Sequence, residues 1–342
     1  MYTPAHSLSI RSSQQSRNVF VWCTVSHKIA IGCSRSPLKV STMYRWIHIA
    51  YRTFYPGRAT TAFTLFPVVV EPSGPITYAV QQNGPPLPRQ SQEMVLPGDY
   101  GIYNTDGSTP NFYYRFTRRL SLSKLQRGME RASAALAAKT VLTPVLHDKA
   151  LQRDGRCVLT GSIDYDALTT TWILPPSLGY LLSDEQFLQN RYQRSPESCD
   201  MSHLIAPTNV LSIHKSVAVL FRRNAIGVDV DDDYRIVVFH EPKKSGCPPI
   251  NSNLTLFDGP DRPSDQFLRV HFAYCLAAHA FGGDLTEDFK DGEVENFMLA
   301  FDKMSPDDPL RQSFLGKRVE QFYVRQTLKT YVIFFMHRYN ML

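Results

Sequence analysis

Short apolar and aromatic runs, separated by Pro and Gly turn signals, recur between residues 62 and 120, and this pattern is typical of short strands. The segment 62–80, AFTLFPVVVEPSGPITYAV, predicts two short strands, which Pro67 and the turn at 72–75 punctuate. Two further strands are predicted over 98–105 and 111–120, where aromatic and β-branched residues recur. The first third of the chain is therefore expected to be rich in strands.

Helical spacing and helix-end signals predict helices over 121–139, 144–153, 177–190, 264–281 and 310–331. The second ends at Asp154–Gly155 and the fourth at Gly282–Gly283, because glycine adopts the left-handed conformation that closes a helix. The Pro-rich stretch 81–90, QQNGPPLPRQ, has no such spacing and is interpreted as a linker or long loop.

Residues 157–239 show both the strand pattern and the helix pattern. Segments 157–160 and 169–174 are apolar and β-prone, and they predict two strands. Apolar residues at helical spacing predict a helix over 211–222, with Ser212 as its N-cap. Segment 227–239 then predicts two short strands. The fold class expected from these patterns is α+β.

Three segments in this order resemble an HNH endonuclease domain of the kind found in large fungal families: RDGRCVLTG (153–161), TWILP (171–175) and NVLSIHKSVAVLFR (209–222). The family reads approximately R-D-x-x-C-V-x-T-G, then A-H-I-I-P, then N-G-I-x-L-x-x-x-x-H-x-x-F-D. The stretch 268–283 is also similar to the family. The resemblance implies a ββα unit, preceded by the strand-rich segment and flanked by helices.

In HNH enzymes the first His is the general base, the Asn fixes its loop, and the last His ligates one divalent cation. In this chain Trp172 replaces the first His, Ala218 the last His, and Arg222 the acid that follows the Phe. An indole can donate a hydrogen bond but neither accepts a proton nor binds a metal. The resemblance therefore implies a catalytically degenerate site. We expect Trp172 near the end of the second strand, largely buried where water and cation would lie.

Two residues remain as candidates for a catalytic role. Asn209 matches the loop-fixing Asn, although a turn or cap Asn is an equal interpretation. His214 precedes Ala218 by four residues, which places both on one face of the predicted helix. His214 could then replace the missing ligand, or it could be an exposed helix residue. The candidate nucleic-acid contacts are cations of the same segment: Lys215, Arg222 and Arg223. Cations near a helix C-terminus also suit the helix dipole.

The sequence predicts no resident metal or small-molecule cofactor. The acidic residues at 229 and 231–233 lack the Gly and the terminal Glu of a calcium-binding EF-hand loop, and they predict a charged turn between strands. The six cysteines include no C-x-x-C pair, which argues against a zinc ribbon. They are interpreted as reduced thiols of an intracellular protein, in the nucleus or the cytoplasm.

The charge of the chain is unevenly distributed. Residues 1–70 hold eight Lys and Arg and no acid, so the chain's net charge of +6 becomes −2 for residues 71–342. Residues 71–342 are therefore close to neutral and lack the excess of basic residues that is typical of a dedicated DNA-binding protein. The Ser- and Arg-rich N-terminus is weakly similar to a mitochondrial targeting peptide. No apolar run is long enough to span a bilayer, so no membrane association is expected.

The chain divides into four predicted parts: a basic, acid-free extension without stable structure (1–60), a strand-rich segment plus a helix (61–143), the HNH-like ββα unit (144–241) and a helical C-terminal region (242–342). Three functions are compatible with this division. The first is a degenerate HNH-like protein with residual DNA binding. The second is a non-enzymatic protein-interaction module, and the third is an active metal-dependent endonuclease that uses displaced ligands such as His214.

Overall fold

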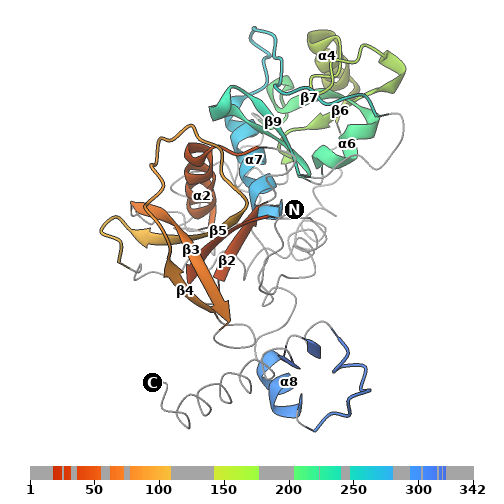
Figure 1. Cartoon of the computed structure of the whole chain (residues 1–342). Helices are drawn as coiled ribbons and strands as arrows, with labels where there is room; N and C mark the ends of the chain where they lie inside the picture. The colour runs from red at the N-terminus through yellow and green to blue at the C-terminus, as the bar shows by residue number, and fades with distance from the viewer. Residues whose placement is uncertain are drawn as a thin grey trace, which may run out of the picture.

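The computed structural model has an α+β fold (Figure 1). It describes residues 18–24, 27–31, 37–54, 62–72, 78–108, 142–176, 204–222, 224–239, 247–279, 293–301, 303–313, 316–317 and 319–320. The strand predicted over 111–120 and the helices predicted over 121–139 and 177–190 lie outside these residues, as does most of the helix predicted over 310–331.

The N-terminal strands form one five-stranded sheet. Its order is β2-β1-β5-β3-β4, with β1 Val19–Thr24, β2 His27–Ile31, β3 Phe63–Pro72, β4 Tyr78–Gln82 and β5 Gly98–Asn104. Strands β1 and β5 run parallel, and the other neighbouring pairs are antiparallel. The strands predicted within 62–80 and 98–105 are thus confirmed. The predicted break at Pro67 is wrong, because β3 continues through it as it passes from pairing with β5 to pairing with β4.

Strand β1 is buried on both faces. Val19 and Val21 belong to a core that lies beneath helix α2 (Val40–Phe54), while Phe20 and Trp22 belong to a smaller core on the opposite face. This division follows from the two-residue period of a strand. The Trp22 indole Nε1 donates to Asp99 Oδ1 at 2.8 Å, so its polar atom is satisfied inside the smaller core.

Residues 1–60 were predicted to be an extension without stable structure, and for 19–24, 27–31 and 40–54 that prediction is wrong. This segment contributes β1, β2 and α2, and α2 buries Met43, Trp46 and Ile47 almost completely against the sheet. Each large apolar side chain buried in this way stabilises the fold by about 1.5–3 kcal/mol. The acid-free composition of the segment therefore does not indicate a separate extension.

The middle of the chain begins with α4 (Pro144–Asp154), which confirms the helix predicted at 144–153. Thr143 caps its N-terminus by accepting a hydrogen bond from the Leu146 N–H, and Gly155 closes it in the left-handed conformation. Strand β6 (Leu168–Trp172) pairs antiparallel with β7 (Val210–His214), and α6 (Lys215–Arg222) follows directly. The order is strand, strand, helix.

Two of the predicted boundaries are wrong. Residues 157–160 form a turn rather than a strand, closed by bonds from the Cys157 N–H to the Ser162 carbonyl and from the Gly161 N–H to the Cys157 carbonyl. Residues 210–214 are a strand rather than the first turn of a helix, so Ser212 is not an N-cap. Because residues 210–213 are buried on both faces, they form a continuous apolar run that periodicity alone does not distinguish from a helix.

Helix α7 (Asp265–His279) joins the two halves of the structure (Figure 1). It packs on β8 (Ile226–Asp229), which pairs with β9 (Arg235–Val238), and it also contacts α2. Phe272, Cys275 and Leu276 of α7 and Val237 of β9 share one core with the N-terminal sheet. This core therefore crosses the boundaries predicted from the sequence. Helix α8 (Glu293–Phe301) lies further along the chain. None of the helices described is long and apolar enough to cross a membrane.

We expect Gly227→Ala to lower the free energy of unfolding by about 2 kcal/mol, because the packing of β8 on α7 leaves no room for a methyl group at this position. A Cβ at Gly227 would lie 2.8 Å from Cys275 Sγ and 2.9 Å from Phe272 Cδ2. Urea denaturation measures the loss. Adding Cys275→Ala removes one of the two clashes, so the second substitution should cost less in the Gly227→Ala background than alone. Strict additivity of the two changes would contradict this packing.

Candidate functional site

Asn209 lies at the entrance to β7 and its side chain is completely buried. Its Oδ1 accepts from the Leu174 N–H at 2.9 Å, and its Nδ2 donates to the carbonyls of Leu174 at 2.7 Å and Leu204 at 2.9 Å. One side chain thus fastens the segment that leaves β6 to the segment that enters β7.

An arginine–carboxylate pair supports the same strands. Asp154 is 2% exposed, is paired through both oxygens with Arg153, and accepts from the Ser212 N–H at 2.9 Å. Arg153 also donates to the carbonyls of Pro207 and Val210. Arg156, two residues after Asp154, lies over the ring of Phe257, with its guanidinium carbon 5.1 Å from the ring centroid.

Trp172 ends β6, the first strand of the pair rather than the second, and pairs with Val210. Its side chain is partly buried. Ala218 lies in α6 as predicted and is 2% exposed. It belongs to the apolar core that also contains Val217 and Phe221. The Ala218 side chain therefore points into an apolar core.

His214 is the last residue of β7 and not a helix residue, so the predicted shared helix face with Ala218 does not exist. It pairs with Leu168 at one end of the ladder, whereas Trp172 pairs at the other end. Four strand residues separate the two positions by about 13 Å. The Nδ1 of His214 lies 2.7 Å from Ser216 Oγ and accepts from the Ser216 N–H at 3.2 Å. The structure does not bring His214 to the Trp172 end.

The predicted phosphate contacts lie on α6, except for Arg223, which is outside the described residues. Lys215 and Arg222 are both exposed and lie seven residues apart, so they share one helix stripe about 10 Å long. The Lys215 Nζ donates to the Asp166 carbonyl at 2.6 Å, which ties the loop before β6 to the start of the helix. The stripe presents two cations to solvent.

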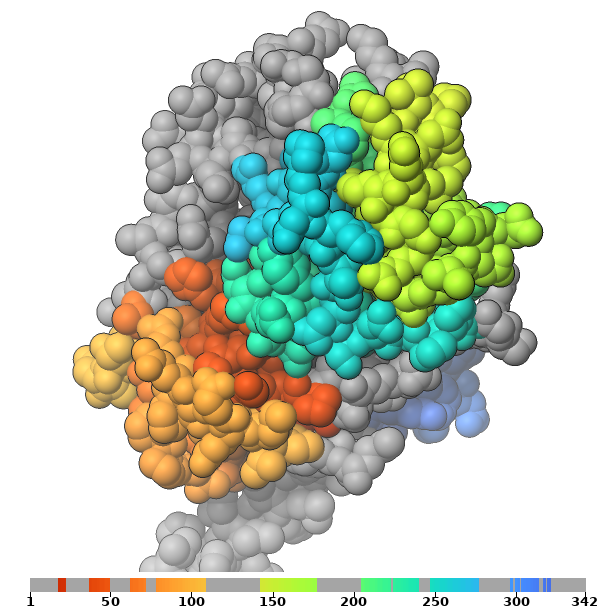
Figure 2. Space-filling view, turned by 90° about the horizontal axis from the view of Figure 1, so that it is seen from above, coloured from red at the N-terminus to blue at the C-terminus, as the bar shows by residue number. Residues whose placement is uncertain are grey.

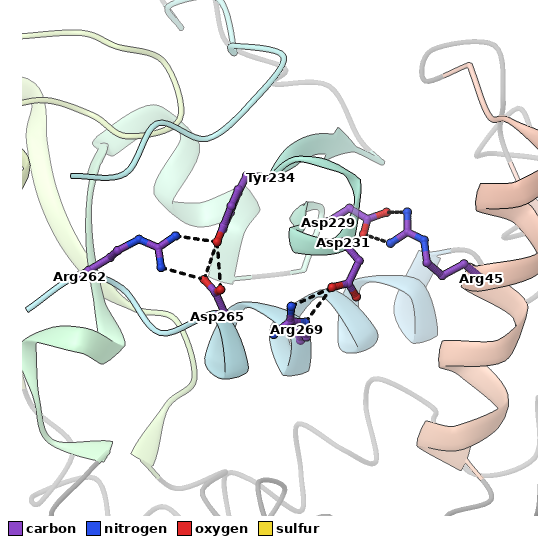
Figure 3. Close-up of polar contacts among 7 residues, drawn as sticks. All are labelled: Arg45, Asp229, Asp231, Tyr234, Arg262, Asp265 and Arg269. Atoms are coloured by element: carbon purple, nitrogen blue, oxygen red, sulfur yellow. Dashed lines mark hydrogen bonds and ion pairs between the residues drawn. The ribbon is translucent and has the colours of Figure 1, made fainter. Parts of the chain in front are cut away.

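The acidic turn between β8 and β9 has the predicted position, and the carboxylates of Asp229, Asp231 and Asp232 are paired with cations; Figure 3 shows the first two. Asp229 is 1% exposed, binds the Arg45 guanidinium through both oxygens, and accepts from Trp46 Nε1 at 2.8 Å. Asp231 binds Arg269. Figure 3 shows these carboxylates directed toward their arginines. In the described part of the chain, no three His, Cys, Asp or Glu side chains are grouped as metal ligands.

Sequence reasoning missed a buried imidazole and thiol on α7. His271 stacks on Phe221 with ring centroids 4.0 Å apart, and its Nε2 donates to the Phe221 carbonyl at 3.1 Å. Its Nδ1 lies 3.6 Å from Cys275 Sγ. Burial lowers the pKa of His271 to about 4 and raises the pKa of the Cys275 thiol well above its usual value. A buried neutral thiol is not an activated nucleophile, so this pair is structural.

No protein-family model matches the chain, and no curated protein or solved structure matches it.

Proposed function

We propose that this chain is a non-hydrolytic HNH-like protein, in which the ββα unit survives as a scaffold and α6 contacts nucleic-acid phosphates. The observation that carries the proposal is the Asn209 side chain. Its three bonds to Leu174 and Leu204 join the segments on either side of the β6–β7 pair, as the loop-fixing Asn of the HNH enzymes does. The order β6, β7, α6 is also strand, strand, helix, although β7 takes the place of the strand expected at 157–160.

The donor set does not fit a catalytic cation. Phosphodiester hydrolysis of the HNH type needs a base for the attacking water and a metal that stabilises charge on the phosphate. At the two corresponding positions the chain has Trp172 and Ala218, and the second is enclosed in the apolar core. His214 would have to act from the opposite end of the β6–β7 ladder. The endonuclease with displaced ligands is therefore the weakest of the three functions.

Nucleic-acid contact rests on the exposed stripe of α6. Lys215 and Arg222 can each neutralise one phosphate, which supplies affinity without sequence information. With only two such cations and a body of net charge −2, the expected binding is weak and depends steeply on salt.

A non-enzymatic protein-interaction module is the second candidate, and one observation favours it. Ile163 and Tyr165, in the loop before β6, are 72% and 65% exposed, and they flank Asp164. Asp166 follows them and is also exposed. Exposed apolar side chains among acids are unsuited to a polyanion, and they suit contact with another protein.

We expect the purified protein to retard DNA weakly in a gel and not to nick supercoiled plasmid above background in Mg²⁺, Mn²⁺ or Zn²⁺. Lys215→Ala with Arg222→Ala should reduce the slope of log affinity against log salt by about 2, one for each lost phosphate contact. Lys303→Ala with Lys317→Ala removes two exposed cations elsewhere and is the matched control.

Two results would contradict the proposal in different ways. An unchanged salt slope in the α6 variant, or no DNA binding at all, would favour the protein-interaction module. Plasmid cleavage that requires divalent metal and disappears in His214→Ala would establish the displaced-ligand endonuclease.

A further inference from the structure

Residues 83–90, NGPPLPRQ, lie at the surface of the N-terminal half; we call them the proline strap. They follow β4 and form neither helix nor strand. All of them are exposed except Leu87, which is partly buried. The orange and gold atoms of 78–108, which include the strap, lie at the outer surface in the space-filling view (Figure 2).

The sequence itself makes the strap extended. Each proline ring fixes φ near −65°, and a residue that precedes proline is pushed to ψ of about 120–160°. Pro85 is subject to both restrictions, Pro86 to the first and Leu87 to the second. These values are those of the polyproline II helix, which needs no internal hydrogen bonds. The bond from the Ser91 N–H to the Pro88 carbonyl then closes a turn that ends the extended stretch.

The body of the protein holds the strap through Leu87. The Leu87 N–H donates to the Leu65 carbonyl of β3 at 2.8 Å, and the Leu87 carbonyl accepts from the Tyr44 hydroxyl at 2.9 Å. The Leu87 side chain packs on the core beneath α2. One bond, from the Asn83 N–H to the Pro67 carbonyl at 2.8 Å, fastens the start of the strap. Contacts within the protein therefore fix the conformation of the strap in the absence of a partner.

The polyproline II period decides which side chains the strap presents. With three residues per turn, Pro85 and Pro88 lie on one ridge, Pro86 on the second and Leu87 on the third. The anchored ridge is that of Leu87, so the two proline ridges face solvent. The strap therefore exposes a P-x-x-P sequence to solvent, while its third ridge, that of Leu87, packs against the body of the protein.

We propose that the proline strap is a docking site for a small domain that reads polyproline II helices in a groove lined with aromatic side chains, the class that includes SH3, WW and EVH1 domains. Pro85 and Pro88 fill the spaces between the aromatic rings of that groove. Because the strap is fixed in advance, binding loses little conformational entropy. The proposal does not depend on the function proposed for the ββα unit.

Arg89 adds a charge preference to the site. Its guanidinium carbon lies 5.4 Å from the ring centroids of both Tyr44 and Phe63. Such an exposed cation–π contact is weak, so an acidic side chain beside the partner's groove can compete for Arg89. A partner with acids at the end of the groove that receives Arg89 is therefore favoured.

The test uses the full chain on a sensor surface and a panel of purified SH3, WW and EVH1 domains. At least one domain should bind with Kd below about 1 mM, and Pro85→Ala with Pro88→Ala should weaken that binding by about tenfold or more. Pro249→Ala with Pro260→Ala, which removes two exposed prolines elsewhere, should leave it unchanged. Thermal unfolding of both variants checks that the fold is retained.

A synthetic peptide of residues 81–91 provides a second measurement, which does not depend on the folding of the variant. It should displace the bound domain from the unmodified protein. Absence of binding by every domain of the panel, equal binding by the strap variant, or failure of the peptide to compete would each overturn the proposal.

Discussion

Trp46→Ala is expected to lower the free energy of unfolding by about 4 kcal/mol, in the range typical of a large aromatic removed from a core. Trp46 is 2% exposed and lies edge-on to Phe272, with ring centroids 5.7 Å apart. Its indole also donates to the buried Asp229 carboxylate. The substitution therefore leaves a cavity and removes one partner of a buried charge, and both effects destabilise the fold.

Urea denaturation at neutral pH measures this effect. Trp46→Phe keeps most of the packing and loses the hydrogen bond, so its cost should be smaller, about 2 kcal/mol. The comparison tests whether residues 19–54 belong to the folded body. A loss below about 1 kcal/mol for Trp46→Ala would be the behaviour of a surface position, and it would restore the interpretation of the N-terminus as an extension.

Acidification should destabilise the protein through His271. An unfolded His titrates near pH 6.5, whereas burial against Phe221 lowers the pKa in the folded protein to about 4. Between these pH values the unfolded chain binds a proton that the folded chain excludes, so stability falls as the pH falls from 6.5 to 4. The full loss is about 3 kcal/mol and is complete below the folded pKa.

His271→Gln provides the control, because its amide can still donate to the Phe221 carbonyl but does not titrate. Unfolding free energies at about pH 7 and about pH 4 are compared for both proteins. The unmodified protein should lose about 3 kcal/mol more than the variant, while losses from protonated carboxylates are common to both and cancel. Parallel pH profiles would show that His271 is not the group excluded from protonation.

The predictable parts of the fold are those whose signals are local. Strand β5 shows the dense aromatic and β-branched composition of a strand, and α4 has a Thr cap and a closing glycine, so both followed from the sequence. Strands β1 and β7 were missed because burial on both faces removes the alternation. For β1, the acid-free, Ser- and Arg-rich composition around it also favoured an extension without stable structure.

The candidate site was predictable only in part, for a related reason. The resemblance selected Asn209, and its side chain links the segments that flank β6 and β7 through bonds to Leu174 and Leu204. The burial of Ala218 depends on residues from several elements, and the Arg45–Asp229 pair joins positions 184 residues apart. The spacing of residues within one segment cannot predict contacts between residues that lie far apart in the sequence.

The core shared by β1, α2 and α7 also constrains the order in which the chain folds during synthesis. Val19 and Val21 leave the ribosome well before Phe272 and Leu276, which share their core. At about 5–20 residues per second, synthesis of the roughly 250 residues between them takes about 10–50 s. During that interval the N-terminal sheet lacks the apolar side chains of α7 that complete its core. The nascent chain is therefore expected to need a chaperone until α7 is complete.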